Sequence, residues 1–288
     1  MAAHSLDGRS ILITGASSGI GRATALALAA RGASLYLAGR SEQRHREVLD
    51  AVRAAGASAR FLSLDLSRLA SVRECAAQFL ALAAPLHVLI NNAGMAGSRG
   101  TTHDGFERAF GINHLGPFLL TELLLDRLAS SAPSRIVNLS SKAHYRVRRI
   151  DWVALREPTR TRSAFPEYAV SKLCNVLHAR ELAERLRGRG VSTHSLHPGV
   201  IASDIWRRVP WGVRQLMHLF MHSNEQGALT TLHCATSEAA GRETGLYYDD
   251  CAPRTPSALA LDDALARELS DRSREWVGLR RLIPAAET

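Results

Sequence analysis

Lysine is nearly absent from this chain: of its 36 basic residues, only Lys142 and Lys172 are lysine. Lys172 follows Tyr168 by four residues, and on a helix this spacing places both side chains on one face, one turn apart. Arginine would be a poor substitute, because lysine carries a compact charge on a flexible stem. A free tyrosine titrates near pH ~10, and a nearby cation lowers that pKa. The pair is therefore a candidate acid–base centre, although Tyr-x-x-x-Lys alone is a weak motif.

The chain also lacks any uncharged apolar run of about 18 residues, so no transmembrane helix is predicted. Its first residues show neither the basic nor the apolar region of a signal peptide. The cysteines are widely spaced, so we expect reduced thiols and not a disulfide framework, at Cys75, Cys174, Cys234 and Cys251. These absences predict a cytoplasmic location.

The formal charge of +9 raises the question of nucleic-acid binding. The arginines are spread along the chain, and no helix-turn-helix, zinc-finger or RNP signature accompanies them, so we expect no specific nucleic-acid partner. Attraction to anionic ligands or lipid surfaces stays open. The 12 histidines include no pair with compact metal-ligand spacing beside carboxylates or thiols. No metal site is predicted.

Short β-rich runs alternate with longer segments of helical spacing. Strands are predicted at Ser10–Thr14, Ser34–Gly39, Arg60–Asp65, His87–Asn91, Arg135–Ser140, Val191–His197 and Gly245–Tyr248. Helices are predicted at Arg22–Arg31, Glu42–Ala55, Ala70–Ala83, Asp104–Leu128, Glu167–Arg187 and Asn224–Thr236. Continuous apolar strands between helices are typical of a parallel sheet covered on both faces. We expect residues 1–288 to form a single α/β domain, a Rossmann-type doubly wound parallel sheet of about seven strands.

Two long segments interrupt this alternation, and loops longer than about 12–15 residues are often functional. Ala143–Pro166 is basic, whereas Ser203–Ser223 is apolar and aromatic. We interpret Ser203–Ser223 as a substrate lid, with a membrane-touching patch and ordinary core as alternatives. Arg207, Arg208 and Arg214 keep the surface-binding alternative open. A helical tail is expected at about 258–288.

A glycine-rich turn follows the first strand directly, Thr14-Gly15-Ala16-Ser17-Ser18-Gly19-Ile20-Gly21. Its glycines permit a tight turn and close approach of a pyrophosphate to a helix N-terminus. Gly15-x-Ser17-x-Gly19 also matches the nucleophile elbow of an α/β-hydrolase. The elbow needs earlier strands, however, and leaves Gly21 unexplained. We therefore favour a dinucleotide site formed by Gly15, Ser17, Ser18, Gly19, Ile20 and Gly21.

The second strand ends without an acidic residue. A fold that selects NAD places Asp or Glu there to bind the ribose 2′-hydroxyl. Here the strand ends at Gly39 and is followed by Arg40, whose guanidinium suits a 2′-phosphate. Arg44 is a second candidate, or simply lies on the solvated face of the next helix. The pattern predicts a preference for NADP(H) over NAD(H).

These motifs, taken in order over about residues 8–250, resemble the signatures of short-chain dehydrogenases/reductases. They are Thr14-Gly15-x-x-x-Gly19-x-Gly21, Asn91-Asn92-Ala93-Gly94, Asn113, Ser141 and Tyr168-x-x-x-Lys172. Finer features resemble the retinol-dehydrogenase-like branch: Ile112–Gly116, Arg135–Ser141, Tyr168–Asn175 and His197–Val200. The chain departs from the pattern at Ser203, where many members have threonine, and in lacking the N-terminal membrane anchor of many animal members.

The resemblance implies a role for each catalytic residue. Tyr168 exchanges a proton with the substrate oxygen while hydride moves to or from the nicotinamide. Lys172 lowers the Tyr168 pKa and bonds the nicotinamide ribose. Ser141 hydrogen-bonds the substrate oxygen, and Asn113 holds a water that links Lys172 to solvent. Ser140 is the neighbouring candidate, but adjacent strand residues point oppositely and the family spacing favours Ser141.

The resemblance also implies further cofactor contacts. Asp65 resembles the adenine-contacting residue, with a helix-capping role as its alternative. The remaining expected contacts are Leu66, Asn91, Ala93, Gly94, Pro198, Gly199, Val200 and Ser203, together with Tyr168 and Lys172.

The resulting hypothesis is an NADP(H)-dependent oxidoreductase that acts on an apolar alcohol/aldehyde or ketone. The alternative is a catalytically idle dinucleotide sensor or scaffold, but such proteins usually lose the tyrosine or lysine. Peripheral membrane contact is compatible with the sequence. So is a homo-oligomer formed through the two long helices after the fourth and fifth strands. The sequence names neither the substrate nor the direction of reaction.

Overall fold

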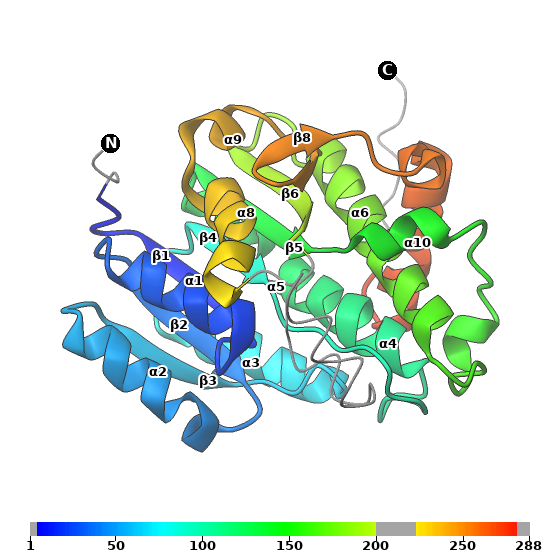
Figure 1. Ribbon diagram of the computed structural model, residues 1–288, viewed down its shortest axis with the longest axis horizontal. Helices are drawn as coiled ribbons and strands as arrows, with labels where there is room; N and C mark the ends of the chain where they lie inside the picture. Colours follow the sequence, from blue (N-terminus) through cyan, green and yellow to red (C-terminus); the bar gives the residue numbers. More distant parts are fainter. Residues whose placement is uncertain (1–4, 200–222, 281–288) are drawn as a thin grey trace.

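The computed structural model describes residues 5–199 and 223–280, which form one eight-stranded sheet (Figure 1). The strand order is β3-β2-β1-β4-β5-β6-β7-β8, and every neighbouring pair is parallel except β7 with β8. The strands are β1 (Ser10–Thr14), β2 (Ser34–Gly39), β3 (Ala59–Ser63), β4 (Val88–Asn91), β5 (Ser134–Leu139), β6 (Val191–His197), β7 (Tyr247–Asp249) and β8 (Ala252–Arg254). The predicted Rossmann-type sheet is confirmed, with one strand more than expected.

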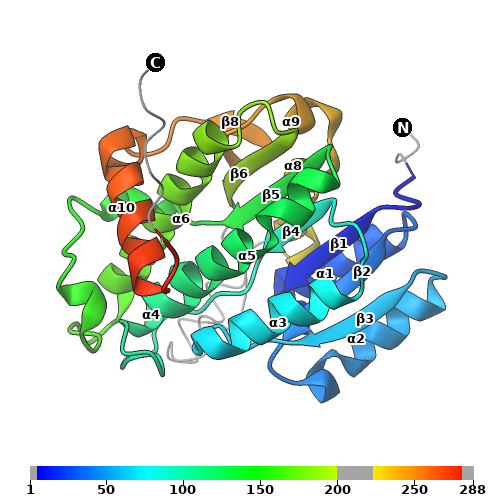
Figure 2. The same ribbon diagram turned by 180° about the vertical axis from the view of Figure 1, so that it is seen from behind.

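Helices cover both faces of the sheet (Figures 1 and 2). On one face lie α1 (Gly19–Ala29), α2 (Glu42–Ala54), α8 (Asn224–Thr236) and the short α9 (Glu238–Arg242). On the other lie α3 (Leu69–Ala81), α5 (Gly116–Ser130), α6 (Phe165–Arg185) and α10 (Asp263–Trp276). Alternate strand residues divide between two cores, since Ile11 and Ile13 pack under α1 and α2 whereas Leu12 packs on the opposite side.

The predicted helix Asp104–Leu128 is wrong at its start and broken inside. It consists of a short α4 (Arg108–Phe110), a π-helical turn η1 (Gly111–Leu115) and α5. Glu107 caps α4, since its carboxylate accepts a 2.8 Å hydrogen bond from the Phe110 N–H. Asp104 serves another helix, because it accepts from the Leu69 N–H of α3 at 2.8 Å. The helix therefore begins four residues late, and Asn113 falls in the π-helical turn.

The antiparallel strand β8 was missed because the turn before it has no glycine. Asp250 and Cys251 join β7 to β8 with φ angles of 52° and 57°. Tight hairpin turns need such positive φ values, which glycine and asparagine normally supply. An Asp-Cys turn carries little signal for a hairpin, so only β7 was predicted, and two residues too early.

The long segments are described in part. The basic segment contains two 3₁₀ turns, η2 (Lys142–Arg146) and η3 (Ala154–Arg156). The predicted lid lies outside the described residues except for Ser223, whose side chain caps α8 by accepting from the Gln226 N–H at 3.2 Å. The predicted tail contains a 3₁₀ turn, η5 (Ala258–Leu261), and α10, and its end falls outside the described residues. In the part of the chain that the structure describes, no helix is both long and apolar enough to cross a membrane.

Buried ion pairs hold α10 against the α5–α6 pair. The Glu122 carboxylate of α5 is 4 % exposed and pairs with Arg185 of α6 and with Arg274 of α10. Arg185 also contacts Glu181 of its own helix, with 2.9 Å between Nε and Oε1. Helix α10 thus covers part of the α5–α6 face that the family resemblance assigns to subunit contacts; the oligomeric state stays a prediction.

Two histidines are enclosed between α6 and its neighbours. His114 of η1 contacts the Ser273 hydroxyl of α10 at 3.2 Å, and its ring lies 5.8 Å from that of His178 in α6. Burial lowers the pKa of His114 to about 3, and burial also holds the pKa of His178 well below its usual range. Both rings are therefore neutral in the folded protein at physiological pH.

We expect the free energy of unfolding to fall as the pH drops below ~6.5. The unfolded chain then binds a proton at His114 that the folded chain does not bind. The contribution of neutral His114 to the free energy of unfolding is therefore fully present above pH ~6.5 and is lost progressively toward the folded pKa of about 3. At pH ~5 the loss from His114 alone is about 2 kcal/mol. Denaturant unfolding of the wild type and His114→Asn at pH ~7.5 and pH ~5 measures it, and the variant should lose correspondingly less. The matched control is His103→Asn, because His103 is exposed, and its pH sensitivity should equal that of the wild type. Equal pH sensitivity of the wild type and His114→Asn would contradict the assignment.

Candidate active site

The expected cofactor site lies where the order of the sheet reverses, between β1 and β4. Open α/β sheets bind ligands beyond the carboxyl ends of their strands at such a switch point. The turn after β1 and the segment after β4 meet there, because the Thr14 hydroxyl accepts from the N–H groups of Asn92 and Ala93 at 3.1 and 3.0 Å. The Asn92 amide in turn donates to the carbonyls of Thr14 and Gly15 at 2.8 and 3.1 Å. Asn92 is thus a structural residue that fastens the two loops together.

The glycine-rich turn leaves no room for a side chain at Gly15 or Gly21. Gly15 has a φ of +71°, and a Cβ there would lie 2.9 Å from the Ala93 Cα. A Cβ on Gly21 would lie 2.4 Å from the Gly15 carbonyl oxygen and 2.5 Å from the Asn92 amide nitrogen. Ser18 precedes α1 without capping it through its side chain. The first N–H groups of α1 therefore stay available to an anion, as a pyrophosphate site requires.

Several expected cofactor residues turn their side chains into the protein. Asn91 is buried and donates to the Thr121 hydroxyl and the Asn138 side-chain oxygen at 3.0 and 2.9 Å. Leu66 is buried in the core beneath Gly116. The Asp65 carboxylate accepts from the N–H and hydroxyl of Ser67 at 2.9 and 2.7 Å. For Asn91 and Leu66, only backbone atoms are positioned to reach a cofactor.

The other expected contacts line the same edge of the sheet. Ala93 and Gly94 follow β4, and Pro198 and Gly199 follow β6, all of them partly or fully accessible. Val200 and Ser203 lie outside the described residues.

The predicted catalytic side chains come together at the start of α6. Tyr168 lies in the first turn of α6, and the Lys172 Nζ is 5.7 Å from the centre of its ring. Ser141 is the second residue after β5, and its side chain hydrogen-bonds that of Tyr168. The Ser140 hydroxyl points the other way and donates to the Lys172 carbonyl at 2.6 Å. Of the two serines, Ser141 is the one beside the tyrosine.

Asn113 reaches the same site from η1. Its amide nitrogen donates to the Ser171 hydroxyl and the Met95 carbonyl, both at 2.9 Å, and its oxygen accepts from the Met95 N–H at 2.8 Å. A Cβ on Gly94 would lie 3.3 Å from the Lys172 Nζ and 3.4 Å from the Asn113 oxygen. π-helical turns occur frequently at functional sites, and this one fixes Asn113 against the lysine.

The electrostatics differ from the sequence expectation. Burial raises the pKa of Tyr168, and only the hydrogen bond with Ser141 acts to lower it. The Lys172 ammonium donates to the Leu139 carbonyl at 2.9 Å and faces the phenol ring. Burial lowers the pKa of Lys172 to about 8. The pKa of Tyr168 is thus raised and not lowered, whereas the pKa of Lys172 lies close to neutral pH.

The sequence missed two side chains that position the catalytic group. The Asn175 amide donates to the Leu139 carbonyl at 3.0 Å and so shares the acceptor of Lys172. The Ser171 hydroxyl accepts from Asn113 and donates to the Tyr168 carbonyl at 2.7 Å. Ser171 lies three residues after Tyr168 and Asn175 three residues after Lys172, and this helical spacing was the available signal.

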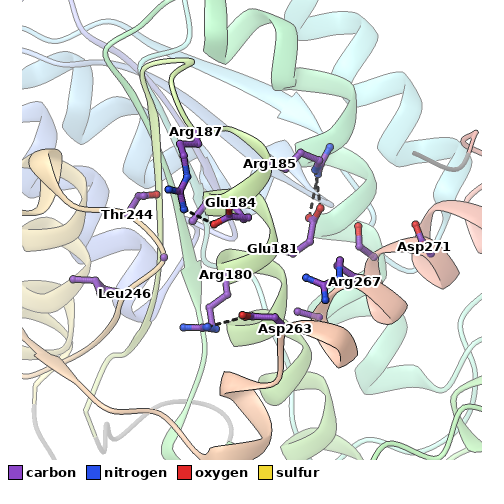
Figure 3. A pocket seen from close by; sticks show the side chains of 14 residues that line it. Arg180, Glu181, Glu184, Arg185, Arg187, Thr244, Leu246, Asp263, Arg267 and Asp271 are labelled. Carbon is purple, nitrogen blue, oxygen red and sulfur yellow. Dashed lines mark hydrogen bonds and ion pairs between the residues drawn. The ribbon is translucent and has the colours of Figure 1, made fainter. Parts of the chain in front are cut away.

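A separate cavity of about 970 Å³ lies beside the second half of α6, α10 and residues 244–246 (Figure 3). Its charged walls are largely paired, with Arg180 directed at Asp263 at 2.8 Å and Arg187 at Glu184 at 2.6 Å. None of the predicted site residues lines it. Within residues 5–199 and 223–280, no group of three His, Cys, Asp or Glu side chains is arranged to hold a metal ion.

Comparison with known proteins agrees with this geometry. Residues 9–155 match the family model of the short chain dehydrogenases. Retinol dehydrogenase 12 of Mus musculus is 44 % identical over 96 % of this chain and 88 % of its own length. The crystal structure of an uncharacterised protein from Mycobacterium paratuberculosis superposes with a TM-score of 0.78 at 31 % identity, covering 98 % of both chains. A blue fluorescent protein from a metagenomic library, solved in complex with NADPH, gives a TM-score of 0.69 at 27 % identity over 85 % of this chain and 97 % of that one. The chain therefore belongs to the short-chain dehydrogenase family, a family of nicotinamide-dependent oxidoreductases, and within it resembles the retinol dehydrogenases.

Proposed function

We propose that this protein is an NADP(H)-dependent oxidoreductase that acts on an apolar alcohol, aldehyde or ketone. The observation that carries the proposal is the hydrogen-bonded Ser141–Tyr168 pair, with Lys172 one turn further along α6, beside the glycine-rich turn. The glycine-rich turn, with its excluded side chains and uncapped helix N-terminus, fits a dinucleotide pyrophosphate. The bound cofactor would supply or accept hydride at nicotinamide C4.

Side chains of the protein would transfer the proton to or from the substrate oxygen. Tyr168 would give a proton to the substrate oxygen or take it, and Ser141 would donate a hydrogen bond to that oxygen as charge develops. Lys172, with a pKa of about 8, would exchange protons between the tyrosine and solvent near neutral pH. The Asn113 side chain is fixed by its bonds to Met95 and Ser171, and Asn113 would hold a water that links Lys172 to solvent.

The preference for NADP(H) rests on the end of β2. Gly39 supplies no carboxylate for a ribose 2′-hydroxyl, and Arg40 and Arg44 follow at the exposed N-terminal end of α2. That helix end favours anions through its backbone dipoles. The NADPH complex of the metagenomic relative supports the same choice.

The apolar substrate class is supported by the similarity to retinol dehydrogenase 12, whose name gives an apolar alcohol as its substrate, and by the apolar composition of residues 203–223. An idle dinucleotide sensor on the same fold is the rival. It gives no reason for the simultaneous presence of Tyr168, Lys172, Ser141 and Asn113 in one cluster.

We expect Arg40→Ala to raise the KM for NADPH by about 10- to 100-fold and to leave that for NADH nearly unchanged, because one charge-assisted hydrogen bond is lost. Initial rates with NADPH and with NADH measure this change in KM. Equal KM values for NADPH and NADH in the wild type would refute the cofactor preference.

The same rates, taken with a long-chain apolar aldehyde and with a charged sugar, test the substrate class. Faster turnover of the sugar would refute the apolar assignment.

A further inference from the structure

A buried histidine of α2 fills the space beside the last residue of β2. The imidazole of His45 is 2 % exposed and lies over Phe61, with 5.2 Å between ring centres. A Cβ built on Gly39 would lie 2.3 Å from its Cε1 and 2.8 Å from its Nε2. Real Cβ atoms essentially never approach other atoms so closely, so His45 and any side chain at position 39 exclude each other.

The histidine is not free to turn aside. Its Nδ1 lies 2.8 Å from the Ser41 carbonyl oxygen, which can only accept, so Nδ1 carries the hydrogen. Rotating the ring would break this bond and its packing on Phe61, in a helix whose buried stripe includes Val48 and Val52. The Cε1–Nε2 edge is thereby held against Gly39.

The same edge carries an unused polar atom. Nε2 is buried and has no hydrogen-bond partner among the described residues. An unpaired buried polar atom is destabilising, so the ring occupies this place despite a penalty. It lies at the strand end where an NAD-selecting fold carries the carboxylate for the ribose 2′-hydroxyl.

We propose that His45 is a specificity-determining residue that keeps a carboxylate from the end of β2 and thereby reserves this position for a 2′-phosphorylated adenosine. The inference rests on the proposed NADP(H) function and deepens it. Arg40 and Arg44 supply the positive charge, whereas His45 decides which residue can stand at position 39. The substitution Gly39→Asp alone therefore cannot convert the site to NAD(H).

Calorimetric titration with adenosine 2′,5′-bisphosphate and with AMP tests this without any turnover. The wild type should bind the bisphosphate at least about tenfold more tightly than AMP, because one charge-assisted hydrogen bond to the 2′-phosphate provides that difference. Gly39→Asp should lower the melting temperature and weaken the binding of both nucleotides. The double variant Gly39→Asp/His45→Ala should have a higher melting temperature than Gly39→Asp. Its preference for the bisphosphate over AMP should be at least about tenfold smaller than that of His45→Ala.

Gly39→Ala is the matched steric control, since it adds only the Cβ. Its melting temperature should fall and should recover when His45→Ala is added. An unchanged melting temperature in Gly39→Ala, or a full change of preference in Gly39→Asp alone, would overturn the inference while leaving the proposed function intact. Equal binding of both nucleotides by the wild type would instead refute the NADP(H) preference itself, and the inference with it.

Discussion

Replacement of Tyr168 by phenylalanine is expected to lower kcat by about 10²- to 10⁴-fold, the range typical of a lost general acid or base. The phenyl ring still fits beneath the Lys172 ammonium, so the shape of the site and the binding of NADPH should persist. Only the hydroxyl that hydrogen-bonds Ser141 and exchanges the proton is removed. Steady-state rates at saturating NADPH, with the dissociation constant of NADPH measured separately, distinguish lost chemistry from lost binding.

Tyr36→Phe is the matched control for this substitution. Tyr36 lies in β2 and packs edge-on against Phe79, with 4.9 Å between ring centres, away from the catalytic cluster. It should keep wild-type kcat. Turnover of Tyr168→Phe within about threefold of the wild type, a difference far below the general-acid range, would remove Tyr168 from the mechanism.

The second large effect concerns stability. Glu122→Ala is expected to lower the free energy of unfolding by about 3–5 kcal/mol, because it leaves the largely buried guanidinium of Arg274 without its carboxylate partner. The two guanidinium groups that meet at this carboxylate are those of Arg185 in α6 and Arg274 in α10. Denaturant unfolding monitored by circular dichroism measures the loss.

An exposed pair supplies the comparison. Glu238 and Arg242 pair across one turn of α9 with both side chains mostly exposed. Glu238→Ala should therefore cost no more than about 1 kcal/mol. Similar losses for Glu238→Ala and Glu122→Ala would mean that the buried cluster does not fasten α10 to the α5–α6 pair.

The sequence predicted the sheet and the placement of the site because both depend on strong local patterns. Apolar strands alternating with helices admit few topologies, and the carboxyl ends of parallel strands bring their loops to one edge. Gly15 and Gly21 were interpretable for the same reason, since the structure shows why nothing larger fits there. Ser141 could be chosen over Ser140 because adjacent strand residues point oppositely and the family spacing favours Ser141.

What the sequence did not predict depends on contacts between distant residues. Asp104 and Glu107 are equally plausible helix caps, and only the approach of α3 assigns Asp104 to Leu69. The π-helical turn that carries Asn113 has no local signature. The pKa of Tyr168 rises because tertiary burial outweighs the hydrogen bond with Ser141. His45 gave no signal at all, since its partner Gly39 is six residues away.

The most direct test of the central claim follows the hydride itself. NADPH deuterated at the transferable C4 position is incubated with the protein and a panel of apolar aldehydes and ketones, and the products are analysed by mass spectrometry. We predict that deuterium appears on the carbinol carbon of at least one product with the wild type, and that Tyr168→Phe forms far less of it. If NADPH binds tightly but its deuterium stays on the cofactor with every carbonyl compound, the protein is a dinucleotide sensor and not an oxidoreductase.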